Sequence, residues 1–120
     1  MSTRQKRIEH LKVDGSEVSG DFDASVDFTS DVISFPDRNS GWSCSVDGWS
    51  GVTAGTPTLS FLASNKADGD FNEYKTVANL LDLKDTANRN NFDDVFPFKY
   101  MKVKYVSGGS TGTFSVTLAK

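Results

Sequence analysis

Residues that could perform acid, base or nucleophilic chemistry are few in this sequence and far apart. The chain contains one histidine, His10, and one cysteine, Cys44. A Ser-His-Asp triad built on His10 is formally possible, but the G-x-S-x-G turn that presents the serine of α/β-hydrolases does not occur. A single histidine also excludes metal sites that use a pair of histidines. We interpret His10 as a surface residue of an edge strand and Cys44 as a small buried hydrophobe.

Acidic residues and glycines supply the remaining candidates for chemistry. The closely spaced acidic pairs are Asp21 and Asp23, Asp68 and Asp70, and Asp93 and Asp94. Acid–base catalysis needs a cleft that separates the pKa values of two carboxyl groups, and the sequence around these pairs indicates none. A calcium loop on Asp68, Asp70 and Glu73 would lack the further ligands and flanking helices of an EF-hand. Residues 108–112 are rich in glycine but lack the P-loop lysine and a following helix. The sequence therefore predicts no enzymatic activity, no cofactor and no metal site.

Charge and hydropathy limit the classes of partner. The chain of 120 residues has 13 Lys and Arg against 16 Asp and Glu, a net charge of −3. This acidic balance argues against nucleic-acid binding. Apolar runs are too short for a membrane-spanning helix, and no export signal follows Met1. Arg4, Lys6 and Arg7 form a small basic cluster. We therefore predict a basic N-terminal arm over residues 1–7 and a single domain over residues 8–120.

The elements of that domain follow from alternating apolar and polar residues. This period of two runs through residues 8–13, 22–28, 42–46, 59–64, 98–107 and 113–120, and more weakly through 71–77. Because alternate side chains of a strand point to opposite faces, each segment predicts a strand with one buried face. Residues 77–84 fit one or two helical turns or a further strand. Seven or eight short strands indicate an all-β antiparallel β-sandwich with jelly-roll-like architecture.

Turn residues and the alternation also predict connections and a core. We expect residues 42–46 and 59–64 to pair, and residues 108–112 to form a hairpin loop between the last two strands. Trp49 is expected in the connection between residues 42–46 and residues 59–64. The predicted core residues are Phe22, Val26, Phe28, Trp42, Leu59, Phe61, Val103, Phe114, Val116 and Leu118.

Aromatic and basic residues are the remaining candidates for binding. An aromatic platform for sugars could use Trp49 and Tyr74 together with Trp42 and Tyr100, although the alternation favours Trp42 as core. Trp49 could either close one end of the sandwich or face a partner. The predicted strand over residues 98–107 also contains Lys99, Lys102, Lys104 and two tyrosines. We interpret this basic strand as facing solvent or another subunit.

Several short strings resemble small β-sandwich proteins of tailed-bacteriophage particles. They are Trp-Ser-Gly at 49–51, Ala-Gly-Thr-Pro-Thr-Leu-Ser-Phe at 54–61, Ser-Asn at 64–65, Phe-Pro-Phe-Lys-Tyr at 96–100 and the glycine-rich string at 108–116. Their order and spacing over residues 41–120 are similar to that family's W-x-G, G-T, S-N and P-F-x-Y pattern. The family's S-N turn usually continues with Asp-Gly, whereas Lys66 and Ala67 intervene here. Residues 1–40 lie outside the resemblance.

The resemblance implies a non-enzymatic virion protein, assembled in the host cytoplasm. Its role would be that of a capsid decoration protein that binds the major capsid protein lattice, or of a tail or neck component. A carbohydrate- or receptor-binding module on the particle surface is the alternative. We expect a homo-oligomer or a lattice-bound protein, with no nucleic acid or membrane as partner. The residues expected to contact a partner are Arg4, Lys6, Arg7, Trp49 and Tyr74.

Overall fold

The chain folds as an all-β antiparallel sandwich, as the alternation predicts. A computed structural model describes residues 8–35, 42–81 and 96–120. The strands are β1 (Ile8–His10), β2 (Lys12–Val13), β3 (Ser16–Glu17), β4 (Phe22–Asp23), β5 (Phe28–Thr29), β6 (Ile33–Ser34), β7 (Ser43–Ser50), β8 (Thr58–Ser64), β9 (Asn72–Val77), β10 (Tyr100–Val106) and β11 (Thr113–Ala119). The predicted arm over residues 1–7, and residues 82–84 of the segment expected as helical turns or a strand, lie outside the described residues.

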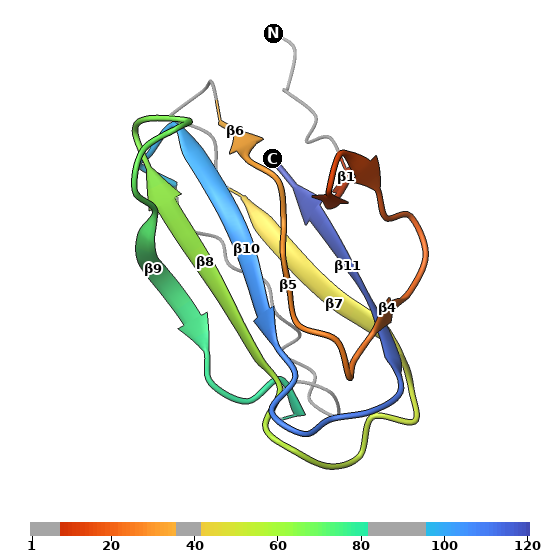
Figure 1. The fold of residues 1–120 in the computed structure, drawn as a ribbon. Helices are drawn as coiled ribbons and strands as arrows, with labels where there is room; N and C mark the ends of the chain where they lie inside the picture. The colour runs from red at the N-terminus through yellow and green to blue at the C-terminus, as the bar shows by residue number, and fades with distance from the viewer. Residues whose placement is uncertain (1–7, 36–41, 82–95) are drawn as a thin grey trace, which may run out of the picture.

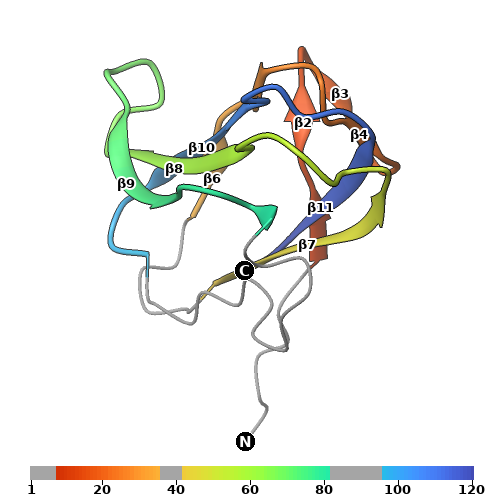
Figure 2. The ribbon, with the colours of Figure 1, turned by 90° about the horizontal axis from the view of Figure 1, so that it is seen from below.

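Two sheets form the layers of the sandwich, and a short hairpin lies beside them (Figures 1 and 2). In the four-stranded sheet, β11 pairs with β7 on one side and with β1 and β4 on the other. In the five-stranded sheet, the order is β9, β8 and β10, and β5 and β6 both pair with the far side of β10. The strands β2 and β3 form the hairpin, whose turn uses Asp14 and Gly15 at positive φ.

The long strands place one apolar row of each sheet in a common core. Burial alternates residue by residue along β8 and β11 and along most of β10. Eight of the ten residues expected in the core are buried there, and Phe28 is half-buried and packs against it. Val26 is the exception, because 54% of its surface is exposed. The core also includes Tyr105, Leu80 and Phe96, which were not among the ten expected core residues.

Residues 22–28 do not form the single strand that their alternation predicts. The carboxylate of Asp23 accepts hydrogen bonds from the amide of Ser25 at 2.9 Å and from its hydroxyl at 2.6 Å, and the amide of Val26 donates to the Asp23 carbonyl. This turn ends β4 and exposes Val26. The chain then joins the opposite sheet as β5. Residues 8–35 consequently supply edge strands to both sheets.

Two further expected connections are wrong for a shared reason. The strand β7 pairs with β11, whereas β8 pairs with β9 and β10, so the expected pair of segments lies in different sheets. Residues 108–112 likewise cross between sheets instead of joining two neighbouring strands. Alternation assigns faces to a strand but does not identify its neighbours. Trp49 also lies on β7 itself, because that strand continues to Ser50.

The glycines of residues 108–112 allow two loops to meet backbone to backbone at one end of the sandwich. The amide of Thr56 donates to the carbonyl of Gly108 at 3.1 Å. A Cβ atom at Gly108 would lie 2.3 Å from the Thr56 carbonyl oxygen, and one at Gly112 would lie 2.4 Å from that of Ser50. Both glycines also have positive φ. The glycine-rich string is therefore required for this close approach rather than for a hairpin turn.

Two buried hydroxyl groups tie residues 8–35 to β10. The amide of Val103 donates to Oγ of Ser30 at 2.8 Å, where the serine takes the place of a backbone partner between β5 and β6. The hydroxyl of Tyr105 donates to the carbonyl of Ala24 at 2.7 Å and is buried. Burial, aided by the negative charge of Asp27, raises the pKa of Tyr105 to about 12 from its ordinary value of 10.0.

The raised pKa of Tyr105 predicts a loss of stability in strong alkali. The folded chain keeps this proton up to about pH 12, whereas an unfolded tyrosine releases it near pH 10. The stabilising contribution is therefore present below pH 10 and is lost as the pH rises from 10 to 12. In a titration followed by tyrosinate absorbance, one tyrosine should ionise late in the folded protein and the Tyr105→Phe variant should lack that step. An unchanged titration of the variant would contradict the assignment.

Candidate interaction surface

The structure does not bring together the two aromatic residues expected to contact a partner. Trp49 lies on β7 of the four-stranded sheet, half-buried, with its ring stacked on Phe114 at a centroid distance of 5.7 Å. Tyr74 lies on β9 of the five-stranded sheet and meets Phe96 edge-on at 5.3 Å. Both rings thus pack against core aromatics, so they form no shared exposed platform. Arg4, Lys6 and Arg7, the other expected contacts, lie outside the described residues.

The described acidic residues are not arranged as a catalytic or metal site. Asp23 is occupied by its turn, where the hydrogen bonds from Ser25 lower the pKa of its carboxyl group. Among the described residues, no group of three or more His, Cys, Asp or Glu side chains lies close enough to hold a metal ion. His10 stands on β1 opposite Thr117. Burial raises the pKa of the Cys44 thiol to about 12, which suppresses its reactivity at neutral pH.

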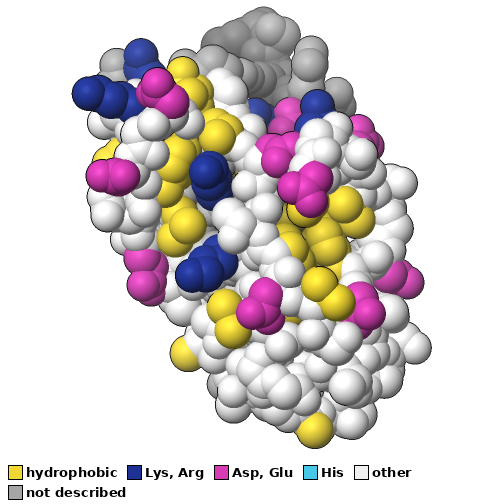
Figure 3. Space-filling view, viewed as in Figure 1, with side chains coloured by type: hydrophobic (Ala, Val, Ile, Leu, Met, Phe, Trp, Pro, Cys, Tyr) yellow, Lys and Arg dark blue, Asp and Glu magenta, His cyan; other side chains and the backbone are white. Residues whose placement is uncertain are grey.

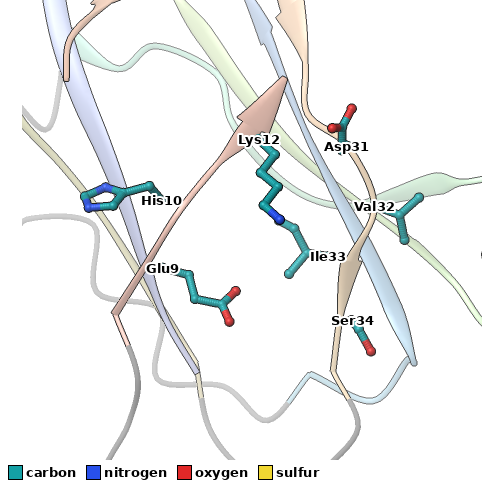
Figure 4. Close-up of a pocket in the computed structure, with 7 residues that line it drawn as sticks. All are labelled: Glu9, His10, Lys12, Asp31, Val32, Ile33 and Ser34. Atoms are coloured by element: carbon teal, nitrogen blue, oxygen red, sulfur yellow. The ribbon is translucent and has the colours of Figure 1, made fainter. Parts of the chain in front are cut away.

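A small pocket of about 120 Å³ lies where the edge strands β1 and β6 of the two sheets approach each other (Figure 4). Glu9 and Lys12 line it from one side, and Ile33 and Ser34 line it from the other. One end is closed by the amide of Asp31, which donates to the carbonyl of Lys12 at 2.7 Å.

The side chain of Lys120 bridges the two walls of this pocket, and we call this contact between β1 and β6 the seam. Its ammonium group lies 3.5 Å from Oε2 of Glu9 on β1, and it donates a hydrogen bond to the carbonyl of Ser34 on β6. It also lies 5.1 Å from the ring centroid of Phe35. Lys120 is paired with the opposite charge of Glu9 and links the two sheets through Ser34. We therefore interpret the pocket as part of the contact between the sheets.

The outer face of the five-stranded sheet has a different character. On β10 the outward residues are Tyr100, Lys102, Lys104 and Val106, because Met101, Val103 and Tyr105 point into the core. Leu62 on β8 is paired with Lys102, and Glu73 on β9 is paired with Leu62. We call these outward residues of β8, β9 and β10, together with Phe71, the β10 face. Figure 3 shows lysine side chains between groups of apolar side chains on this side of the molecule.

Contacts within the β10 face hold its side chains in place. The ammonium group of Lys102 lies 4.7 Å from the ring centroid of Phe71, a cation–π contact. The hydroxyl of Thr76 donates to Oγ of Ser60 at 3.1 Å and also contacts the carboxylate of Glu73. The hydroxyl contacts therefore order Glu73 and Thr76 in the folded chain, whereas Lys102 covers the ring of Phe71.

Sequence reasoning identified only part of this face. The basic aromatic strand over residues 98–107 was recognised, and its Tyr105 lies in the core with Met101 and Val103, as the alternation of that strand predicts. Phe71, Leu62 and Glu73 were not associated with the lysines, because their proximity depends on the register of β8 with both neighbours. Leu62 lies between the buried residues Phe61 and Ala63 and therefore faces outward.

The outer face of the four-stranded sheet carries mostly short polar side chains on β7 and β11. Ser45 is paired with Thr117, and Ser43 with Ala119. The hydroxyl of Ser115 donates to the carboxylate of Asp47 at 2.7 Å. These short polar side chains contrast with the lysines and apolar side chains of the β10 face.

Comparison with known proteins gives no match among family models, curated proteins or solved structures. Within the described part of the chain, no helix has the length and hydropathy needed to cross a membrane.

The position of Trp49 predicts a role in stability. Replacing Trp49 with alanine removes a ring that stacks on Phe114, and we expect the free energy of unfolding to fall by about 2 kcal/mol. This is less than the roughly 3–5 kcal/mol for a fully buried aromatic residue, because Trp49 is half-exposed. Chemical denaturation measures the loss, and Trp49→Phe, which keeps a ring, should retain most of the stability. An unchanged denaturation midpoint for Trp49→Ala would show that the ring does not support the core.

Proposed function

We propose that this protein is a non-enzymatic structural component of a bacteriophage particle, a decoration protein that binds the lattice of major capsid protein. The observation that carries the proposal is that several polar side chains of the described residues make contacts that hold the fold together. Asp23, Ser30 and Tyr105 brace turns and edge strands, and Glu9 and Lys120 close the seam between the sheets. The outer sheet faces remain for contact with other molecules.

The shape of the molecule supports a docking role. Seven-residue strands β8 and β10 pair along their whole length, which makes the centre of one outer face regular and firmly held. A protein lattice offers extended surfaces, and a sheet face held by a continuous strand ladder can cover part of such a surface without rearrangement. The motif order over residues 41–120, similar to that of phage-particle β-sandwich proteins, adds support for the particle as the location.

A carbohydrate- or receptor-binding module on the particle surface is the second candidate. The observation that favours it is the presence of Tyr100 and Phe71 on the β10 face, since sugar rings pack on aromatic side chains. Trp49 and Tyr74, the aromatics first considered for this purpose, are engaged with Phe114 and Phe96 instead. The decoration role is therefore the stronger of the two proposals.

Co-sedimentation with capsid shells tests the decoration role. The protein is produced together with the major capsid protein from the same phage genome, and shells are separated from free protein on a density gradient. We expect the protein to sediment with the shells at a fixed ratio to the capsid protein. If the protein stays separate from the shells at all concentrations, the proposal is contradicted. Association with purified tails instead would assign the protein to the tail.

The basic arm provides a second prediction for the same assay. Deleting residues 2–6 should leave the fold intact and weaken attachment to shells, because Arg4 and Lys6 are lost from an otherwise acidic chain. The loss should be larger at low salt, where charges between exposed groups are least screened. Replacing Arg4, Lys6 and Arg7 with glutamine keeps the length of the arm and serves as the charge control. Equal attachment of all three proteins would exclude a binding role, and unfolding of the deletion variant would assign the arm to the sheet.

A further inference from the structure

The β10 face carries side chains in cross-strand rows whose ends are chemically complementary. The ladder between β10, β8 and β9 places Lys102, Leu62 and Glu73 in one row. The backbone of this row thus runs from a lysine on β10 through an apolar residue on β8 to a glutamate on β9. In the single copy the ammonium group of Lys102 lies over the ring of Phe71 beside β9, so pairing with a second copy moves it from that ring to the partner's carboxylate. These three strands lie side by side in one layer (Figure 1).

We propose that two copies of this chain associate face to face through the β10 face, about a twofold axis parallel to β8. Such an axis places Leu62 of one copy against Leu62 of the other. It also places Lys102 opposite the partner's Glu73, and the second such pair follows by symmetry. A contact of this kind is isologous, since the same patch is used by both copies.

The neighbouring rows of side chains also place compatible residues opposite each other across the twofold axis. Ser64 lies opposite Tyr100, and Phe71 immediately precedes the residue paired with Ala63, so the row beside Lys102 has an aromatic side chain at each end. The row on the other side runs from Lys104 through Ser60 to Thr76, and no acidic residue meets an acidic one under the twofold. The next row begins at Val106, which is 38% exposed and stands opposite Thr58. The twofold therefore brings ring against ring, lysine against glutamate or threonine, and apolar against small side chains.

The mixed charge of this face is what favours a second copy as its occupant. A polyanion or a uniformly acidic partner would meet the carboxylate of Glu73 on the same surface as the two lysines. A second copy instead supplies a carboxylate for a lysine and a lysine for a carboxylate. Opposite charges arranged in this way fix the register of the two sheets and disfavour shifted arrangements. Twisted sheets that pack face to face also stay nearly aligned, as the twofold requires.

The size of the face sets the strength of the contact. Three strands of about seven residues span roughly 14 Å by 23 Å at the usual strand spacing and rise. This is smaller than the area of roughly 800 Å² per partner in a standard interface. We therefore expect a weak dimer, with a dissociation constant between about 10 μM and about 1 mM.

Charge reversal tests the row directly by sedimentation velocity of the purified chain, from about 10 μM to about 1 mM. Wild type should shift from monomer to dimer over this range. Lys102→Glu and Glu73→Lys should each raise the dissociation constant about tenfold or more, because each brings like charges together. The variant with both changes restores a self-complementary row, so its dimerisation should return to near the wild-type value, and an equimolar mixture of the single variants should form a heterodimer.

A matched control lies on the β2–β3 hairpin. Lys12 and Glu17 are also an exposed cross-strand pair of opposite charge, but they lie off the β10 face. Lys12→Glu and Glu17→Lys should leave dimerisation unchanged. Thermal unfolding of every variant confirms that the chain is folded. Monomeric wild type at all concentrations, or a double variant as weak as the single variants, would overturn the proposal.

Cross-linking tests the position of the axis. Leu62→Cys places a thiol on the twofold, where a short bismaleimide should join two copies, while buried Cys44 stays unmodified. Thr117→Cys places the thiol on the outer face of the opposite sheet and should give no dimer. Equal cross-linking of both variants would show that the contact is not through the β10 face. Because these measurements use the isolated chain, they can fail while shell binding succeeds, and the reverse also holds.

Discussion

The packing of Phe114 against aromatic residues from both sheets is the contact on which the rest of the structure depends. This side chain of β11 is fully buried and lies 6.0 Å from the ring of Phe22, 5.7 Å from Trp49 and 4.9 Å from Tyr105. Phe22 and Trp49 belong to its own sheet, whereas Tyr105 belongs to the other. Each of these rings removes a large apolar area from water, so this cluster supplies much of the force that holds the layers together.

The path of residues 8–35 follows from that cluster. Phe22 and Phe28 stack at 4.3 Å although their strands lie in opposite sheets, so the chain between them must cross the gap while both rings stay against the core. The turn at Asp23 makes the crossing possible, and the hydroxyl of Tyr105 secures it at Ala24. Polar residues that attract attention as possible chemistry are thus used to satisfy backbone groups where edge strands begin and end.

The sequence predicted correctly which side of most strands is buried, but it did not predict which strands pair with one another. Leu59, Phe61, Val116 and Leu118 were assigned to the core because alternation reports directly which side of a strand is buried. Strand pairing depends on contacts between residues distant in sequence, so the pairing of β7 with β11 could not be read from either segment alone. Val26 shows the local limit, since it satisfies the alternation but falls on a turn that the carboxylate of Asp23 creates. The β10 face was half-predicted for the same reason: its lysines were visible in one strand, while Glu73 and Phe71 reach them only through the register.

The two outer faces divide the possible contacts of the molecule. If two copies cover each other's β10 face, the lysines that were candidates for partner binding become internal to the dimer. The outer surface of the four-stranded sheet, which is rich in Ser and Thr, then faces outward on both sides of the dimer. A lattice contact would use this surface, the sheet edges or the basic arm, and each lattice site would be met by one half of the dimer. Binding by two linked copies gains from effective concentration, so even a weak contact per copy can hold the protein on a repeating surface when the spacing of lattice sites matches the dimer.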